Sequence, residues 1–378
     1  MVDAVLRKVM VVIGTRPEAV KMAPVISELK SRPQNFLCQV VSTGQHREML
    51  RQTLSSFGLK VDIDLDLMQP DQTLASLTGT VVTACEKLFL AEKPDIILVQ
   101  GDTTTVLAAA LAAHYCRIPI GHVEAGLRTH ERYNPFPEEM NRRLVASLAS
   151  LHFAPTTLAE QSLLREGVEA SKIFVTGNTV VDAIHSLRDR ADGPAASPTI
   201  RAMVAAAQGR LVLITCHRRE SFEHDLGIIV SALATLAANF PERTFFFPLH
   251  LNPNVRALVL PRLTGIANIV LADPIPYEDL QYCLAAAELV MTDSGGLQEE
   301  APSFGVPVIV LRRTTERPEG VAAGFAQLVP IEHDGIVALA ADWITSRRKS
   351  ELVGKPSPFG DGQAAKRIAD LVSEARFP

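Results

Sequence analysis

The stretch KVMVVIGTRPEAVKMAP, residues 8–24, joins a run of β-branched and aliphatic residues to a more polar segment through a glycine. Its first seven residues predict a strand buried on both faces, because strands of a parallel sheet are covered on each side and carry continuous apolar side chains. A helix from about Ala19 to Ser31 is predicted to follow. Repeated along a chain, this strand–turn–helix unit predicts a parallel α/β sheet.

The same alternation recurs along the chain, with one interruption. Further strands are predicted at 37–43, 95–101 and 118–123, and helices begin near Arg47 and Pro137. Residues 189–209 are dominated by Pro, Gly, Ser and Ala, which we interpret as an exposed connector. Beyond it, strands are predicted at 210–216, 243–249, 268–272, 287–292 and 306–311. The predicted fold class is therefore α/β, with two Rossmann-like, doubly wound domains.

Length and composition limit the class of protein. A chain of 378 residues with 47% hydrophobic and 21% charged residues is globular and long enough for two domains. A net charge of −5 and a pI near 6.1 argue against nucleic acid or an anionic membrane as the main partner. The five cysteines form no C-x-x-C pair, so neither a metal site nor a disulfide framework is expected. With no secretory signal or membrane span apparent, we expect a cytoplasmic protein.

Charged residues follow the predicted strands of the first half, at the sheet edge where open α/β sheets bind ligands. Arg16 and Lys21 follow the first strand, Asp102 follows the strand at 95–101, and Glu124 follows the strand at 118–123. Asp102 could instead be a helix N-cap, although the three threonines after it can also serve as caps. These positions predict a site rich in acids.

The segment HVEAGLRTHERYNPFPEE, residues 122–139, contains four glutamates. A carboxylate at a helix N-terminus is an ordinary dipole partner, and we assign that role to Glu139. Glu131 is expected to face solvent. The two prolines of NPFP restrict the loop and favour a positioned side chain. Glu124 and Glu138 are therefore the two glutamates expected to take part in chemistry.

The second half carries residues suited to a nucleotide diphosphate. Ser294, Gly295 and Gly296 follow a strand and open a helix, where backbone N–H groups favour phosphate. Glu299 or Glu300, one turn later, could accept hydrogen bonds from ribose hydroxyls. Three arginines and two histidines also follow strands: Arg312, Arg313, Arg317, His217 and His250. Neither G-x-G-x-x-G nor a P-loop is present, so a sugar nucleotide is favoured over a dinucleotide cofactor.

Nine motifs in order give the chain a family resemblance. They are GTRPEAVKMAP, QGDTTT, VEAGLRT, NPFPEEMNR, GNTVVD, HRRESF, HLNP, DSGGLQEEAP and TTERPEG, from about residue 8 to residue 320. Together they resemble the non-hydrolysing UDP-N-acetylglucosamine 2-epimerases of bacterial type. The resemblance implies a GT-B-like pair of domains facing across a cleft, usually as a homodimer. It implies reversible C2 epimerisation of UDP-GlcNAc to UDP-ManNAc without cofactor or metal, for surface polysaccharide.

The resemblance also implies roles for individual residues. The catalytic set is Asp102, Glu124, Glu138, His217 and Arg16. The substrate-binding set is His250, Ser294, Gly295, Gly296, Glu300, Arg317 and Arg142. A second, activating UDP-GlcNAc would contact Lys21, Gln45, His46 and Arg47. We expect an N-terminal domain over residues 1–178 carrying the acids, a C-terminal UDP-binding domain over 179–360, and a terminal helix over 361–378 that packs back on the first domain.

Two departures and two alternatives accompany the resemblance. Arg313 and His130 stand where the family usually has other residues, which bears on substrate detail rather than reaction class. Arg313 would either tighten UDP binding or face solvent. The alternative functions are a GT-B glycosyltransferase and a hydrolysing 2-epimerase, each acting on UDP-GlcNAc. The sequence leaves open which carboxylate removes the proton and which returns it.

Overall fold

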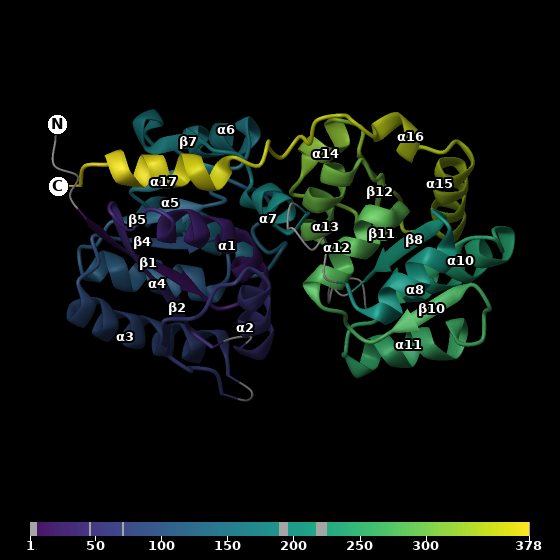
Figure 1. Cartoon of the computed structure of the whole chain (residues 1–378), viewed down its shortest axis with the longest axis horizontal. Helices are drawn as coiled ribbons and strands as arrows, with labels where there is room; N and C mark the ends of the chain where they lie inside the picture. Colours follow the sequence, from purple (N-terminus) through teal and green to yellow (C-terminus); the bar gives the residue numbers. More distant parts are fainter. Residues whose placement is uncertain (1–5, 45–46, 70–71, 189–195, 217–224, 378) are drawn as a thin grey trace. The chain divides into compact units, whose positions relative to one another are not determined.

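The chain folds into two compact units (Figure 1). The computed structural model describes residues 6–44, 47–69, 72–188, 196–216 and 225–377. Unit 1 comprises Met1–Ser186 and Phe359–Pro378, and unit 2 comprises Leu187–Pro358. The two ends of the chain therefore belong to the same unit.

Unit 1 is built on a seven-stranded parallel sheet with strand order β3-β2-β1-β4-β5-β6-β7. Its strands are β1 (Arg7–Ile13), β2 (Phe36–Ser42), β3 (Ile63–Asp64), β4 (Ile96–Gln100), β5 (Ile120–Val123), β6 (Leu151–Ala154) and β7 (Ile173–Val175). Its helices are α1 (Arg16–Lys30), α2 (Arg47–Ser56), α3 (Leu74–Glu92), α4 (Thr104–Tyr115), α5 (Glu138–Leu148), α6 (Thr157–Arg165), the 3₁₀ turn η1 (Ala170–Lys172), α7 (Thr179–Arg188) and α17 (Ala364–Glu374).

The sheet of unit 1 is covered on both faces, as its apolar strands predict. Side chains alternate along a strand, so Val9 and Val11 of β1 enter the core under α1 and α17, while Met10 and Val12 enter the core under α3 and α4. The C-terminal helix α17 packs directly against α1 (Figure 1). Both faces of β1 are buried, and this burial fixes the position of the turn that follows the strand.

Unit 2 repeats the arrangement with a six-stranded parallel sheet of order β10-β9-β8-β11-β12-β13. Its strands are β8 (Leu211–Thr215), β9 (Thr244–Pro248), β10 (Ile269–Ala272), β11 (Ala287–Thr292), β12 (Val308–Val310) and β13 (Ala326–Leu328). Its helices are α8 (Pro198–Ala207), α10 (Asp225–Asn239), α11 (Pro253–Leu263), α12 (Tyr277–Ala286), α13 (Gly295–Glu300), η2 (Ala301–Phe304), α14 (Pro318–Ala322), α15 (His333–Thr345) and α16 (Lys349–Leu352). Two doubly wound parallel sheets confirm the predicted fold class.

The structure differs from the sequence prediction in the connector. Residues 198–207, expected to be exposed and irregular, form α8, which starts at the N-cap Ser197 with Pro198 in its first turn. Ile200 and Ala207 of α8 are buried in the core that also contains α12. The prediction was wrong because a segment rich in Pro and Ala is typical of a loop, whereas Ser-Pro is also a common start of a helix.

Helix α3 stands apart among the helices of the described residues. It alone is long and apolar enough to span a membrane by length and composition. One face, with Leu77, Val81, Cys85 and Phe89, is buried in the core shared with α4. The helix is thus part of the folded interior of unit 1, and its opposite face carries the exposed Leu90 beside the exposed Glu86 and Lys87.

Candidate active site

The strand orders place two sheet edges where a ligand can bind. In each unit the order reverses between the first strand and the fourth, at β1/β4 in unit 1 and at β8/β11 in unit 2. Ligands of open α/β sheets bind outside the carboxyl ends of the strands at such a reversal. In unit 1 these ends present Arg16, Asp102 and Glu124, each directly after or near the end of a strand.

Glu124 lies buried between a cation and an amide. Its Oε1 accepts a hydrogen bond from the Lys21 ammonium, and its Oε2 accepts one from the side-chain amide of Gln100. The side chains of Lys21 and Glu124 are only 8% and 6% exposed. Glu124 also has a positive φ of 64°, which is uncommon outside glycine and marks a position fixed by its surroundings. The carboxylate is therefore held in one place.

Asp102 is close to Glu124 and has its own cation. Strands β4 and β5 pair with Gln100 opposite Val123, so the residues that follow them are neighbours. A methyl group on Gly101 would lie 3.5 Å from Glu124 Oε2. Arg142 donates to Asp102 Oδ2 from Nε at 2.8 Å and approaches it with Nη2 at 2.6 Å. The N-cap of α4 is Thr103, which leaves the Asp102 side chain out of helix capping.

Arg142 thus has a direct contact with one of the predicted catalytic acids. It is 4% exposed and lies on α5, which begins at Glu138. Its neighbour Asn141 donates from Nδ2 to the backbone oxygen of Asp102 at 2.8 Å. Both side chain and backbone of Asp102 are therefore fixed by α5, and an Arg–carboxylate pair of this kind is a strong, directional contact.

The other three glutamates of residues 122–139 have different environments. Glu138 is half-buried at the first residue of α5, whereas Glu131 is exposed, as expected. Glu139, assigned above to the helix dipole, is in the first turn of α5 as that role requires, and it is also fully buried. It accepts from the backbone N–H groups of Thr129 and His130 at 3.0 and 3.3 Å. Glu139 therefore holds the loop against α5, a role that depends on tertiary contacts and is not visible in the sequence.

Two further buried groups support this edge and were missed by sequence reasoning. Glu18 accepts from Gly14 N at 2.6 Å and from Thr103 Oγ1 at 2.7 Å, joining the turns after β1 and β4. Burial raises the pKa of Glu18 to about 7. His122 makes a 2.7 Å hydrogen bond through Nε2 to Gly101 O, and burial lowers the pKa of its imidazole to about 3. His122 is therefore neutral at neutral pH and donates to that carbonyl.

The first group of predicted residues in unit 2 gathers around Arg317. This side chain is 7% exposed and donates from Nε to Glu299 Oε1 at 2.8 Å. A methyl group on Gly295 would lie 2.8 Å from Arg317 Cζ, so glycine is required there for the guanidinium to pack. Ser294 is at the N-cap position of α13, without a side-chain capping hydrogen bond, and donates its backbone N–H to Thr292 Oγ1 at 2.9 Å. An arginine and a helix start thus meet at the end of β11.

Glu300 is oriented by a side chain that sequence reasoning did not select. Gln281 of α12 donates from Nε2 to Glu300 Oε2, and both residues are buried. Glu300 Oε1 lies beside Gly296, where a methyl group would be 3.5 Å away. His250, by contrast, is exposed beyond β9, where its Nδ1 accepts from Asn252 N at 3.2 Å.

Several of the predicted site residues lie outside the described residues or away from the two groups above. His217, Gln45 and His46 lie outside the described residues, and of Arg47 only the backbone, at the start of α2, is described. Lys21 was grouped with these allosteric residues, yet its ammonium contacts Glu124. Arg313 has a side chain that is 78% exposed and lies 3.4 Å from Asp225, so it faces solvent. His130 is exposed too.

The chemistry available in the described residues follows from these contacts. An ion-paired carboxylate is in the ionised form, which can accept a proton. Arginines are suited to anionic oxygens because of their planar donor geometry. Within the described parts of the chain, no three His, Cys, Asp or Glu side chains are arranged to hold a metal ion. Proton transfer by carboxylates, with cations nearby, is what this arrangement can perform.

Comparison with known proteins gives a consistent result. The family model described as UDP-N-acetylglucosamine 2-epimerase matches residues 27–373. The UDP-N-acetylglucosamine 2-epimerase of Escherichia coli (strain K12) is 45% identical over 377 residues, covering 98% of this chain and 99% of the relative. The crystal structure of UDP-GlcNAc 2-epimerase from Neisseria meningitidis bound to UDP-GlcNAc is 42% identical, with a TM-score of 0.91, covering 97% of this chain and 100% of that one. A Methanocaldococcus jannaschii UDP-GlcNAc 2-epimerase in complex with UDP-GlcNAc and UDP is 33% identical, with a TM-score of 0.83 and coverage of 97% and 100%.

Proposed function

The chain belongs to the UDP-N-acetylglucosamine 2-epimerase family, and we propose that it is an isomerase that interconverts UDP-GlcNAc and UDP-ManNAc. The observation that carries this proposal is the pair of carboxylates at the ends of β4 and β5. Asp102 is ion-paired with Arg142, and Glu124 is ion-paired with Lys21. An inversion at C2 requires a proton to leave one face of the sugar and return to the other, which takes more than one acid/base group.

The proposed mechanism is an anti elimination followed by a syn addition. The C1–O bond to UDP breaks and its electron pair leaves with the diphosphate. The cation-like C1 acidifies the C2–H bond, whose proton passes to a carboxylate, and 2-acetamidoglucal forms with a C1=C2 double bond. UDP then adds back to C1 while C2 is protonated on its opposite face. Asp102, Glu124 and Glu138 are the proposed acid/base groups, with Arg16 and His217 assisting the departing diphosphate.

The UDP part of the substrate is assigned to unit 2. Arg317, fixed by Glu299, is suited to diphosphate oxygens, and Glu300, oriented by Gln281, can accept from a ribose diol. Ser294, Gly295 and Gly296 supply backbone at the start of α13. His250 is exposed beyond β9 and completes the proposed set. The proposal thus separates the nucleotide-binding residues from the proton-transferring ones.

The decisive experiment is incubation with UDP-GlcNAc in deuterated water, followed by NMR. Wild type is expected to place deuterium at C2 of both epimers, because the proton is lost to a group that exchanges with solvent. Glu138→Gln should slow this exchange about 10²–10⁴-fold while UDP binding is retained, since only a proton-transfer group is lost. Unlabelled UDP-ManNAc from wild type would exclude elimination through C2.

The same loop offers a matched control. Glu131 is exposed, so Glu131→Gln should exchange at the wild-type rate.

The products of the wild-type reaction distinguish the two alternative enzymes. A hydrolysing 2-epimerase would release free UDP in step with product, and a glycosyltransferase would form no UDP-ManNAc, since it passes the sugar to an acceptor without inverting C2.

We also propose that UDP-GlcNAc activates the enzyme at a second site. The proposal rests on the family resemblance of residues Gln45, His46 and Arg47. With UDP-ManNAc as the only substrate, initial rates are expected to be low and to rise on addition of UDP-GlcNAc. A hyperbolic UDP-ManNAc curve that added UDP-GlcNAc does not steepen would remove regulation from the proposal.

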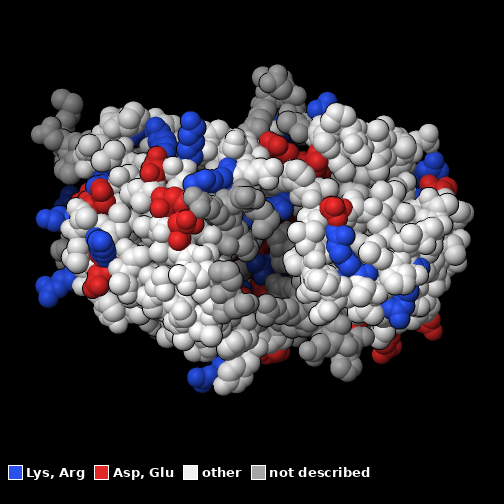
Figure 2. Space-filling view, turned by 90° about the horizontal axis from the view of Figure 1, so that it is seen from below, with Lys and Arg blue, Asp and Glu red and all other residues white. Residues whose placement is uncertain are grey.

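The remaining assignments concern the cellular setting. We propose a cytoplasmic homodimer that supplies ManNAc-type sugars for surface polysaccharide. Leu90, exposed on the outer face of α3, is the apolar side chain that we assign to the dimer contact. Positive and negative side chains are interspersed on the face drawn in Figure 2, which suits a small anionic substrate better than a polyanion.

A further inference from the structure

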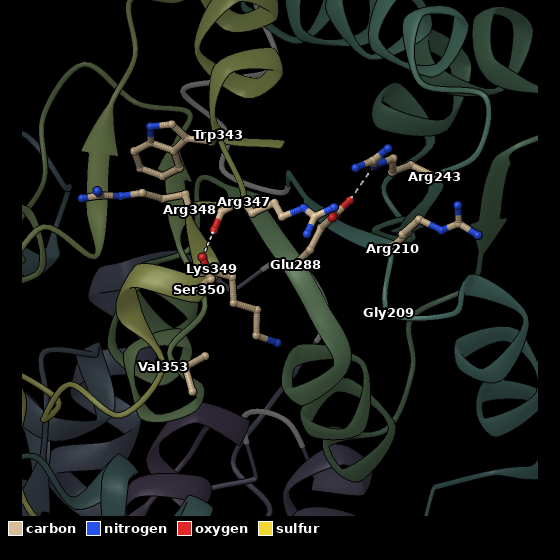
Figure 3. A pocket seen from close by; sticks show the side chains of 10 residues that line it. All are labelled: Gly209, Arg210, Arg243, Glu288, Trp343, Arg347, Arg348, Lys349, Ser350 and Val353. Atoms are coloured by element: carbon tan, nitrogen blue, oxygen red, sulfur yellow. Dashed lines mark hydrogen bonds and ion pairs between the residues drawn. The ribbon is translucent and has the colours of Figure 1, made fainter. Parts of the chain in front are cut away.

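A basic pocket lies in unit 2 at the edge opposite to the proposed UDP site (Figure 3). Arg210 directly precedes β8, Arg243 directly precedes β9, and Glu288 is the second residue of β11. These three neighbouring strands are parallel, so the pocket is at their amino ends. The proposed UDP ligands follow the carboxyl ends. Since β8 has five residues, the two edges are roughly 16 Å apart.

Cations surround one carboxylate in this pocket, which has a volume of about 430 Å³. Arg210, Arg243, Arg347 and Lys349 line it together with Glu288 (Figure 3). Arg243 donates to Glu288 Oε1 at 3.1 Å. Lys349 donates to the backbone oxygens of two residues that precede or begin β11, at 3.1 and 2.7 Å, so its ammonium is fixed at the pocket wall.

The charges of the pocket are not balanced by the residues around it. Arg243 also ion-pairs with Glu242, and Arg348, the fifth cation of the lining, ion-pairs with Glu351. Five cations and three carboxylates leave a charge of about +2. Among the described residues, neither Arg210 nor Arg347 ion-pairs with a carboxylate. The Arg210 side chain donates to the amide oxygen of Gln208, a neutral group, at 3.0 Å. Like charges brought this close repel one another, so a bound anion would stabilise the pocket.

Two of the side chains that line the pocket, Trp343 and Arg348, are held in place by contacts within unit 2. Trp343 is 8% exposed, and the Arg348 guanidinium lies over its ring at 5.9 Å. Arg348 also donates to Gly324 O at 3.0 Å, which directs it away from the centre of the pocket (Figure 3). Arg347 has a left-handed backbone with φ of 54°, at the junction of α15 and α16. This junction places Arg347 among the lining residues.

We propose that this pocket binds the dianionic phosphate group of a second ligand, separate from the substrate UDP. A phosphate dianion would offset the two unbalanced charges, and arginine guanidinium groups bind phosphate oxygens through two parallel hydrogen bonds. The ligand is either a soluble phosphorylated compound or the phosphate headgroup of a lipid.

Calorimetric titration with inorganic phosphate, in the presence of saturating UDP, tests the proposal. Wild type should bind phosphate saturably, and the Arg210→Ala/Arg347→Ala double variant at least tenfold more weakly. Glu288→Gln should bind about threefold more tightly, because it removes a negative charge from the pocket. Arg262→Ala, an exposed arginine of α11, is the matched control and should bind like wild type.

Three results would contradict the proposal that the pocket binds phosphate. Absence of saturable binding, an unchanged Kd in the double variant, or weaker binding by Glu288→Gln would overturn the proposal. Sedimentation with phosphatidic acid vesicles then separates the two sources. Co-sedimentation of wild type but not of the double variant assigns a lipid headgroup, and phosphate binding without co-sedimentation assigns a soluble compound. Epimerase activity of each variant shows that the substrate site is intact.

Discussion

Glu18 is a carboxylate buried in unit 1 whose donors, among the described residues, are neutral groups. It is 2% exposed and accepts from Gly14 N, Thr15 N and Thr103 Oγ1. Burial disfavours the charged form more than these hydrogen bonds favour it, so the pKa rises to about 7. At the residue scale, this carboxyl group links the turn that carries Arg16 to the turn that carries Asp102.

Glu18→Gln should remove a pH dependence of stability. The folded pKa of about 7 lies above the ordinary value of 4.5, so wild type is favoured in its protonated form and loses stability as the pH rises between these values. The loss is on the order of 3 kcal/mol at about 1.4 kcal/mol per pKa unit. Glutamine resembles the protonated form and does not titrate. Urea unfolding at pH 4.5 and 8, followed by circular dichroism, measures the difference between variant and wild type.

The exposed Glu131 provides the comparison for this prediction. Glu131→Gln should show no such pH-dependent difference from wild type. If Glu18→Gln differs from wild type by the same amount at both pH values, the Glu18 carboxyl group does not titrate in this range.

Several site residues could be read from the sequence because they follow strands. Asp102 and Glu124 were selected in this way, and the structure places both at the same sheet edge. Glu18 also had a signal, since Thr15 and Glu18 have the spacing of a capping box. Gln100 and Gln281 had none. Each is an ordinary polar residue until folding brings it against Glu124 or Glu300.

At the scale of elements, the strands were predictable where they are buried and long. β1, β4 and β8 were found because each is a continuous apolar run. β3, β7 and β13 have only two or three residues each, too few for a pattern to be distinguished from a loop. They are outermost in the strand orders of their sheets, a position that is set by tertiary packing and not by local sequence.

Helix α3 is the element on which the proposed dimer depends. Its outer face includes Leu90, which is 60% exposed, and Gly79, where an added methyl group would meet no atom within 4 Å. Leu90→Arg should convert the dimer to monomer, because a charge that is buried on association loses its hydration. Size-exclusion chromatography with light scattering measures the mass.

Lys87, an exposed cation on the same helix, gives the control for this variant. Lys87→Ala should leave the mass unchanged. A dimer that persists in Leu90→Arg at micromolar concentration would place the interface elsewhere on the chain.

At the scale of the whole molecule, the chain leaves unit 1 through α7 and returns to it as α17. The two segments are joined where Asp182 Oδ1 accepts from Ala365 N at 2.8 Å in the first turn of α17. Ile368 and Val372 then enter the same core as β1 and α1. Unit 1 therefore needs residues from both ends of the sequence, and unit 2 is a single continuous segment.

Ile368→Ala should consequently weaken unit 1 and spare unit 2. Truncation of a fully buried isoleucine costs about 2–5 kcal/mol. The single tryptophan, Trp343, belongs to unit 2, so its fluorescence reports that unit while circular dichroism reports both. In urea, the variant should show an earlier transition by circular dichroism and an unchanged one by fluorescence. Lys366→Ala, exposed on the same helix, should shift neither signal. Equal shifts of both signals in Ile368→Ala would mean that the two units unfold as one cooperative block.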